Sequence, residues 1–115
     1  DICAIEMRAP EDLLRVPAGT GRLLIHDLGY GGLREADAQR LLAAGVRLIG
    51  TNNLSIAAEE VSSAVHTRLL ESEVLLLEGL WLEGLSEGAY ELIALPLRLV
   101  GAEGAPARAF VRAME

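Results

Sequence analysis

Residues 22–50, RLLIHDLGYGGLREADAQRLLAAGVRLIG, decide the fold class of this chain. The run 22–26 is apolar and leads into the glycine-rich stretch 29–32, a pattern typical of a strand that ends in a tight turn. Residues 34–44 carry apolar side chains at helical spacing, and Gly45 is well suited to end that helix. A second apolar run follows directly at 46–50. This order of strand, helix and strand predicts a right-handed parallel crossover.

The rest of the chain predicts an α/β fold: one compact domain, residues 1–115, with a mixed, partly parallel sheet of five or six strands. The second of two main helices is expected at Ile56–Glu71, with Ser55 as its N-cap. The apolar strand that follows at 74–77 is expected to be buried on both faces. Pro96 predicts an edge, a bulge or a break in the first strand of a C-terminal β-hairpin. The remaining expected elements are strands at 2–7, 92–100 and 107–113 and a short helix at 10–14.

Composition limits the classes of function. The chain has 115 residues, 51% of them apolar, which is enough for one domain with its own core. Its net charge of −7 has the wrong sign for binding phosphates, so nucleic acid is not expected as a ligand. A single cysteine cannot form an internal disulfide, and no apolar run is long enough for a membrane helix. We therefore expect a cytoplasmic protein that binds no membrane.

Four features are weak candidates for chemistry. The turn Gly29–Gly32 lies between a strand and a helix, where backbone N–H groups can bind an anion, although it matches neither phosphate-binding glycine motif. His26 ends a strand beside Asp27, which could orient or charge the imidazole, but a local structural role is favoured. Cys3 and Trp81 are both expected to pack in the core, and the alternative for Trp81 is a pocket or an interface.

The strongest candidate site is a pair of potential metal ligands. His66 lies near the border of the apolar stripe of the second helix, and Glu78 closes the strand that follows. A helix that packs on its own next strand can bring these side chains together, and an imidazole with a carboxylate is half of a zinc or manganese site. Glu35 and Asp37 are expected to face away from the apolar side of the first helix. Other acids are expected to form solvated helix surface, including Glu59, Glu60, Glu71 and Glu73.

From Gly45 onward the chain resembles the putative cyclase family of metal-dependent hydrolases, whose members include bacterial kynurenine formamidases. The resemblance rests on GVRLIGT at 45–51, SI at 55–56, HTRLL at 66–70, VLLLEGL at 74–80 and YELIALPLRL at 90–99. It covers about two thirds of the chain. It implies a truncated form of the swivelling β/β/α architecture and a hydrolase that opens amide or lactam-like bonds with the help of zinc or manganese.

The resemblance assigns a metal-binding role to two residues and leaves the site incomplete. His66 and Glu78 match the later His and Glu of the family's ligands. The family's earlier motif, His-x-Gly-Thr-His-x-Asp-x-Pro, is absent from these residues, and Asn52, Asn53 and Ala57 stand where the family usually has acids. Two ligands cannot by themselves anchor a metal ion with an open position for water. The chain starts at a strand without an initiator Met, so we expect it to be the C-terminal part of a longer fold.

Three hypotheses remain open from the sequence. The chain is part of a cyclase-like hydrolase of a small amide substrate, completed by a missing segment or another chain. Alternatively, it is a non-catalytic structural or oligomerisation domain derived from that family, in which His66 and Glu78 pair with each other or with solvent. An anion-binding module at Gly29–Gly32 ranks below both. Because a sheet cut short exposes apolar surface, we also expect a homo-oligomer.

Overall fold

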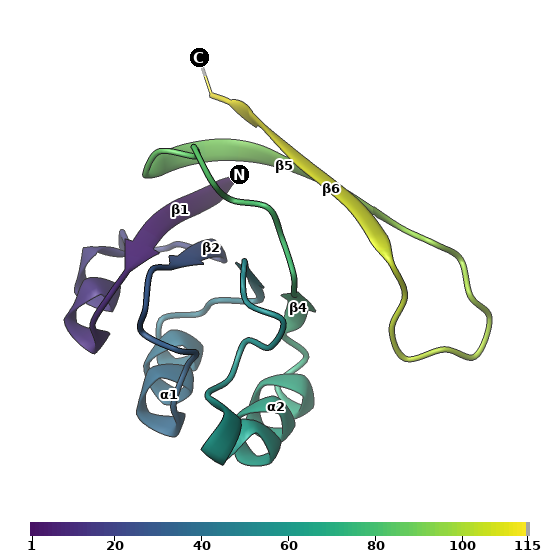
Figure 1. The fold of residues 1–115 in the computed structure, drawn as a ribbon, viewed down its shortest axis with the longest axis horizontal. Coiled ribbons are helices and arrows are strands. Elements are labelled where there is room, and N and C mark those ends of the chain that lie inside the picture. Colours follow the sequence, from purple (N-terminus) through teal and green to yellow (C-terminus); the bar gives the residue numbers. More distant parts are fainter. Residues whose placement is uncertain (115) are drawn as a thin grey trace.

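The computed structural model describes residues 1–114 and contains a six-stranded mixed sheet with its helices on one side (Figure 1). The strand order is β4-β3-β2-β1-β5-β6. Strands β1 to β4 run parallel, whereas β5 is antiparallel to β1 and β6 is antiparallel to β5. The predicted α/β class, mixed sheet and C-terminal hairpin are confirmed. The elements are β1 (Ile2–Met7), η1 (Pro10–Arg15), β2 (Arg22–Asp27), α1 (Glu35–Ala43), β3 (Leu48–Thr51), η2 (Glu59–Val61), α2 (Ser62–Glu71), β4 (Leu75–Leu77), β5 (Gly88–Pro96) and β6 (Ala107–Ala113).

Helical connections explain the parallel half of the sheet. Parallel neighbours need a crossover segment, and α1 supplies it between β2 and β3, while η2 and α2 supply it between β3 and β4. Leu23 of β2 lies beside Ile49 of β3, which in turn lies beside Leu76 of β4. The strand, helix and strand unit predicted from residues 22–50 is therefore present, and its strands end at the same edge of the sheet.

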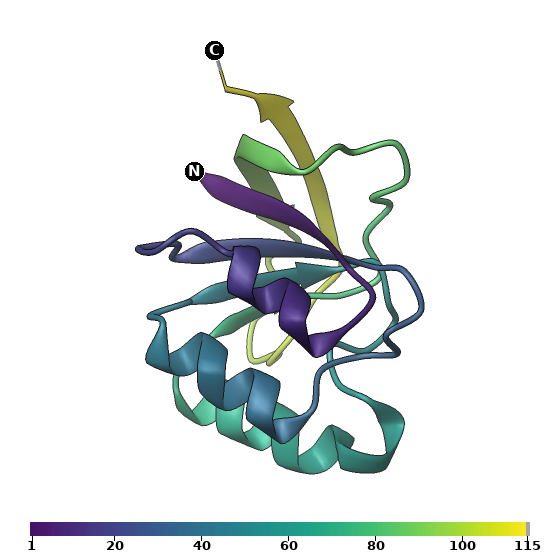
Figure 2. The same cartoon turned by 90° about the vertical axis from the view of Figure 1, so that its left-hand side faces the viewer.

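Alternating side chains divide the core between the two faces of the sheet. On the helix-covered face, Ile5, Leu23 and Ile49 pack with Leu41 of α1 and Leu69 of α2 (Figure 2). The opposite face holds a smaller cluster, which the segment between β4 and β5 covers only in part. That cluster consists of Ile2, Ala4, Leu24 and Leu82. One face of the sheet is thus well covered and the other is partly open.

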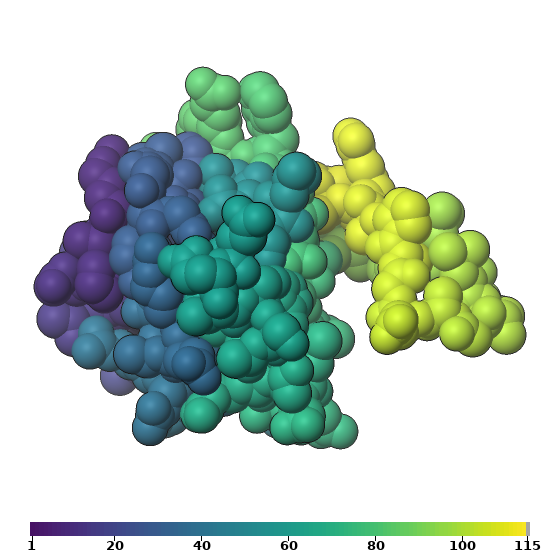
Figure 3. Space-filling model, turned by 60° about the horizontal axis from the view of Figure 1, so that its bottom comes forward, coloured from purple at the N-terminus to yellow at the C-terminus, as the bar shows by residue number. Residues whose placement is uncertain are grey.

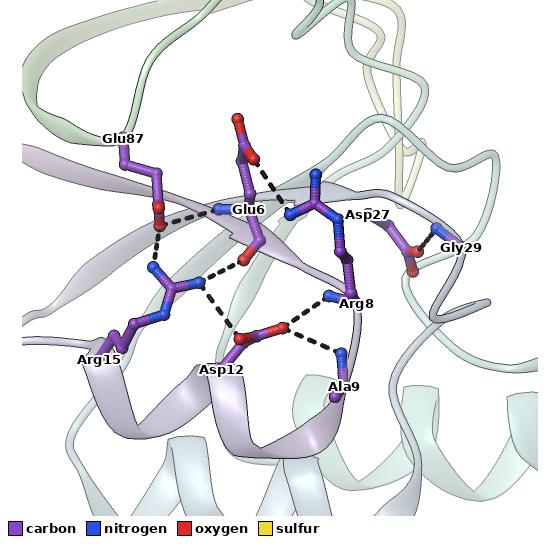
Figure 4. Close-up of polar contacts among 8 residues, drawn as sticks. All are labelled: Glu6, Arg8, Ala9, Asp12, Arg15, Asp27, Gly29 and Glu87. Atoms are coloured by element: carbon purple, nitrogen blue, oxygen red, sulfur yellow. Dashed lines mark hydrogen bonds and ion pairs between the residues drawn. The ribbon is translucent and has the colours of Figure 1, made fainter.

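A group of ion pairs fixes η1 against β1 and the start of β5 (Figure 4). Asp12 accepts hydrogen bonds from the backbone N–H groups of Arg8 (2.7 Å) and Ala9 (3.0 Å), which holds the pKa of its carboxyl below the usual value. Arg15 pairs with Asp12 at 3.3 Å and with Glu87. The hydrogen bond from Arg15 is the main reason why the pKa of Glu87 is also lowered. Three segments are therefore joined at the surface.

The second main helix starts later than its sequence predicts. Residues 56–58 are extended because they bridge to Leu33, whose N–H donates to the Ile56 carbonyl at 2.8 Å and whose carbonyl accepts from the Ala58 N–H at 2.9 Å. The helix therefore begins only at Ser62, after the turn η2. Ser55 is not its N-cap, and the Ser55 hydroxyl instead accepts the Ala57 N–H at 3.2 Å. Val65 and Leu69 are buried as expected.

Three further expectations are wrong in detail. The strand β4 pairs only with β3 and is an edge strand, and Leu75 is 65% exposed rather than buried. Asp37 is buried, because its carboxylate accepts the Arg34 N–H at 2.9 Å and the Tyr30 hydroxyl at 2.6 Å at the start of α1. The first hairpin strand starts four residues earlier than expected, at Gly88, because residues 88–90 pair with β1, and it ends at Pro96.

Candidate metal centre

The structure brings together His66 and Glu78, the two residues that the sequence marks as possible metal ligands. Glu78 directly follows β4 at the edge where the parallel strands end, and α2 carries His66 over the same edge. The Nε2 atom of His66 lies 3.1 Å from Oε2 of Glu78. Both side chains are about one third exposed, at 27% and 32%. The predicted proximity is therefore present, and the pair is accessible to solvent.

Each side chain of the pair is also held by the backbone. His66 Nδ1 lies 2.9 Å from the carbonyl oxygen of Ser62, one helical turn earlier, and 3.2 Å from the Ser62 hydroxyl. Oε2 of Glu78 accepts the N–H of Ile56 at 2.7 Å. The extended segment 56–58, which the sequence wrongly predicts as helix, therefore serves to position the carboxylate. These contacts fix the imidazole and the carboxylate relative to each other.

The contacts of His66 depend on which ring nitrogen carries the proton. A carbonyl oxygen can only accept, so the contact of 2.9 Å with the Ser62 carbonyl favours a proton on Nδ1. With that tautomer Nε2 is an acceptor, and it faces Oε2 of Glu78 at 3.1 Å. A proton shared by the two side chains, or a cation bound by both, is then needed between these atoms.

The donor set fits half of a metal site. An Nδ1–H donated to a backbone carbonyl is the usual arrangement behind a histidine that binds metal through Nε2. An imidazole nitrogen and a carboxylate oxygen suit zinc and manganese. However, among residues 1–114 no three His, Cys, Asp or Glu side chains are grouped closely enough to hold an ion. The described residues thus offer two potential ligands, and a metal site would need others.

The glycine-rich turn already binds an anion of the protein itself. The carboxylate of Asp27 accepts the backbone N–H groups of Gly29 (3.1 Å), Gly31 (3.1 Å) and Gly32 (2.8 Å), and Figure 4 shows the contact with Gly29. Asn53 adds a hydrogen bond from Nδ2 at 2.8 Å. These N–H groups are therefore satisfied internally. The hypothesis of an external anion at Gly29–Gly32 is wrong for this structure.

Asn52 and Asn53 brace the same edge of the sheet. Oδ1 of Asn52 accepts the N–H of Asp27 at 2.7 Å, and its Nδ2 donates to the Asp27 carbonyl at 3.1 Å. The carbonyl of Asn53 also accepts the N–H of Gly79, the residue after Glu78, at 2.7 Å. Asn53 is therefore linked through the backbone to the segment that carries Glu78. The sequence interpretation missed this role of Asp27. An Asp two residues before a glycine-rich turn is a known turn-forming pattern and could have revealed it.

His26 and Asp27 do not form the pair that the sequence offered as the less favoured alternative. Neighbouring residues of a strand point to opposite faces, and the Asp27 carboxylate is occupied by the glycine turn. Nδ1 of His26 is buried without a hydrogen-bond partner among the described residues. Asp27 therefore does not orient the His26 imidazole.

Cys3 and Trp81 have different environments. Cys3 is partly buried, and this burial, together with the nearby Glu87 charge, raises the pKa of its thiol. The raised pKa disfavours the reactive thiolate, in agreement with the expected packing role. Trp81 is 85% exposed, so the expectation that it packs in the core is wrong. Its exposure makes the alternative, a pocket or an interface, the better interpretation.

Comparison with curated proteins finds relatives that are named kynurenine formamidase or cyclase-like protein. A kynurenine formamidase from Sphingopyxis alaskensis is 45% identical over 75 residues, which cover 64% of this chain and 36% of that protein. Cyclase-like protein 2 from Arabidopsis thaliana is 36% identical over 111 residues, covering 83% of this chain and 41% of that protein. The chain thus spans about two fifths of the length of the curated relatives it matches. No family model matches the chain.

Comparison with solved structures shows the same fold. A protein described as a potential metal-dependent hydrolase with cyclase activity superposes with a TM-score of 0.84 and 24% sequence identity. The alignment covers 96% of this chain and 63% of that chain. The arrangement of strands and helices described above is therefore a known one, and it forms a part of a larger solved chain.

Proposed function

Because this chain is a relative of the kynurenine formamidases and cyclase-like proteins, we propose that it is part of a metal-dependent hydrolase of amide or lactam-like bonds. The relationship suggested by residues 45–99 is confirmed by the curated relatives. The contact of 3.1 Å between His66 Nε2 and Glu78 Oε2, with Nδ1 held by a carbonyl, is the observation that supports a metal-binding role. These two residues match the resemblance in type and context.

His66 and Glu78 would supply two of the ligands for a divalent metal ion, such as zinc or manganese. When bound, such an ion polarises a carbonyl and lowers the pKa of a coordinated water. Ser62 would keep the proton of His66 on Nδ1, so that Nε2 stays directed at the site. Ile56 would hold Oε2 of Glu78 in place. Because residues 1–114 supply no third ligand close by, the site would be completed by residues outside this chain.

A metal analysis tests this role of the pair. The affinity of the purified chain for zinc would be measured by equilibrium dialysis, which also detects the weak binding expected of two ligands. We expect His66→Ala to lower this affinity at least about tenfold. The matched control is His26→Asn, which changes the other histidine and should leave the affinity unchanged. Equal affinities in all three proteins would contradict the proposal.

An activity measurement tests the incompleteness of the site. Kynurenine formamidases are named for the formamide of kynurenine, so this compound is the substrate of choice. We expect the metal-loaded chain alone to hydrolyse it no faster than the free metal ion, because two ligands cannot both hold an ion and orient a water. Hydrolysis by the chain alone that is lost in Glu78→Gln would show that no further ligand is required.

A non-catalytic domain is the second candidate function. The observation that favours it is the absence of a group of three potential ligands within residues 1–114, together with the use of Asn52 and Asn53 as braces for Asp27. In that case the positive centre between His66 and Glu78 is a proton, and the two form an ion pair. Stoichiometric metal that disappears on His66→Ala would exclude this candidate.

A further inference from the structure

Asp27 lies where the end of β2, the glycine-rich turn and the loop after β3 meet. Its carboxylate is 8% exposed, and within the described part of the chain it takes part in no ion pair. It accepts hydrogen bonds from three backbone N–H groups of the turn and from Nδ2 of Asn53. A buried carboxylate without a cation depends on such hydrogen bonds, so the segments that donate them are held in fixed positions around it.

A first connection leads from Asp27 to the carboxylate of Glu78. Oδ2 of Asp27 accepts the Gly32 N–H at 2.8 Å, and the next residue, Leu33, is hydrogen-bonded on both sides to the extended segment that begins at Ile56. Gly32 lies so close to the backbone of that segment that a Cβ on it would come within 2.6 Å. The N–H of Ile56 donates to Oε2 of Glu78 at 2.7 Å. The turn around Asp27 therefore fixes the donor that holds the Glu78 side chain.

A second connection leads from Asp27 to the backbone next to Glu78. Nδ2 of Asn53 donates to Oδ2 of Asp27 at 2.8 Å, and the carbonyl of Asn53 accepts the N–H of Gly79 at 2.7 Å. Gly79 has a φ of +70°, so the chain changes direction directly after Glu78. The hydrogen bond to Asn53 fixes the place of this turn, and with it the point from which the Glu78 side chain starts.

The two asparagines are suited to a carboxylate at position 27. Asn52 uses both ends of its amide on the backbone of Asp27, which a carboxylate could not do because it has no donor. An acid at position 53 would likewise place two acceptors opposite each other in the contact with Asp27. Asn52 and Asn53, which stand where the family usually has acids, therefore belong to one arrangement with Asp27.

We propose that Asp27 is a positioning residue for Glu78 and directs the Glu78 carboxylate toward Nε2 of His66 through these two connections. The inference rests on the metal-binding role proposed above and extends it to a residue outside the pair. Because N–H donors surround the carboxylate of Asp27, it orients a ligand and does not itself bind the ion. A ligand that is already oriented loses less conformational freedom when the ion binds, so the affinity is higher.

Zinc affinity, measured by equilibrium dialysis, tests the proposal. We expect Asp27→Asn to lower the affinity about tenfold, as the loss of a group that orients a metal ligand does. Asn53→Ala keeps the charge of Asp27 and the backbone carbonyl at position 53, and it should lower the affinity about threefold, the equivalent of one hydrogen bond. The control for charge is Glu103→Gln, in the loop between β5 and β6, which should bind zinc as the parent does. Figure 3 shows this hairpin, in yellow and yellow-green, standing apart from the helices.

The amide signal of Ile56 in an NMR spectrum without metal shows whether the carboxylate of Glu78 has moved. A hydrogen bond to a carboxylate draws an amide proton downfield, so the signal in Asp27→Asn should move upfield, toward its position in Glu78→Ala. The control for stability is Leu13→Ala, which removes a buried side chain of η1. It should lower the urea midpoint as Asp27→Asn does, but leave the Ile56 signal and the zinc affinity unchanged.

The outcomes distinguish this proposal from the metal-binding role itself. An unmoved Ile56 signal in both Asp27→Asn and Asn53→Ala would overturn the positioning role. Unchanged zinc affinity in both variants would also overturn it, while a loss of affinity in His66→Ala would leave the metal-binding role standing. Equal effects in Leu13→Ala would overturn it as well, since a general loss of stability would then explain them. If His66→Ala binds zinc as the parent does, the metal-binding role fails, and the Ile56 signal alone decides the positioning role.

Discussion

His66 and Glu78, twelve positions apart in the sequence, meet through Nε2 and Oε2 at 3.1 Å, while Nδ1 of His66 lies 2.9 Å from the Ser62 carbonyl. The contact joins α2 to the strand that follows it and lies at the edge where the four parallel strands end. Ligand sites of open α/β sheets are typically found at that edge. The position of the pair in the fold and the contact between Nε2 and Oε2 thus both support the proposed metal-binding role.

Glu78→Gln should separate the metal-binding role of Glu78 from its structural role. Oε2 of Glu78 contacts both the Ile56 N–H and Nε2 of His66. With the amide oxygen at that position, glutamine can still accept the Ile56 N–H, so the fold should be retained. The loss of charge should weaken manganese binding at least about tenfold, as measured by titration calorimetry. The matched control Glu71→Gln, at the exposed end of α2, should bind as the parent does. Unchanged binding by Glu78→Gln would argue against this ligand.

Alanine should lower the free energy of unfolding much more at Gly32 than at its neighbour Gly31. Gly31 and Gly32 both have positive φ, at +88° and +94°, so alanine at either position should cost about 1–2 kcal/mol. A Cβ at Gly32 would also lie 2.6 Å from backbone atoms of Ala57 and Ala58, whereas the space around Gly31 is open. We expect Gly32→Ala to cost a further 1–3 kcal/mol, roughly the cost of overpacking. Urea unfolding measures the free energy of unfolding of both variants. Equal losses would contradict the close approach of Gly32 to the backbone of Ala57 and Ala58.

Asp27→Asn should destabilise the edge of the sheet. The carboxylate accepts hydrogen bonds on both oxygens, so one of them would be replaced by an NH₂ group that faces N–H donors. Loss of charged hydrogen bonds and the unsatisfied N–H groups should together cost about 2–4 kcal/mol in the free energy of unfolding. Glu35→Gln, at an exposed position of α1, is the control and should change this free energy little. A loss below about 1 kcal/mol would show that the turn does not depend on the carboxylate.

The ion pairs around Arg15 should make stability depend on acid. The pKa of Asp12 is lowered mainly by the N–H groups of Arg8 and Ala9, and that of Glu87 mainly by Arg15. Groups with a lowered pKa in the folded state stabilise it at neutral pH and lose this contribution as the pH falls below about 4. The free energy of unfolding should therefore fall less between about pH 5 and about pH 3 in Arg15→Gln than in the parent chain, as measured by urea unfolding. An unchanged pH dependence would show that Arg15 adds no stability through these two carboxylates.

The elements with clear periodicity were predictable from the sequence. Strands at 2–7 and 22–26 and the helix before Gly45 follow from local patterns, and the structure places them within one or two residues. The start of α2 was not predictable, because its pattern continues back through residues 56–58. Only the pairing of Ile56 and Ala58 with Leu33, far away in the sequence, makes that segment extended. Local propensity cannot reveal a contact of this kind.

The two side chains of the candidate site were predictable from the sequence, but the backbone contacts that hold them were not. The proximity of His66 and Glu78 follows from a helix that packs on its next strand. The role of Asp27 could not be inferred from its neighbour His26, because strand alternation separates their side chains. The exposure of Trp81 was also missed, since its apolar neighbours Leu80 and Leu82 suggest a core segment. That segment covers the sheet with its leucines and leaves the indole outside.

The most direct test of the metal-binding role is a manganese titration of the ¹⁵N-labelled chain followed by NMR. The Ile56 N–H is hydrogen-bonded to the carboxylate of Glu78, so its signal reports on that side chain. We expect substoichiometric Mn²⁺ to broaden the signals of Ile56 and His66 first, and we expect this selectivity to be lost in His66→Ala. Broadening that is spread over the acidic surface, or that is the same in His66→Ala, would contradict a metal centre at His66 and Glu78.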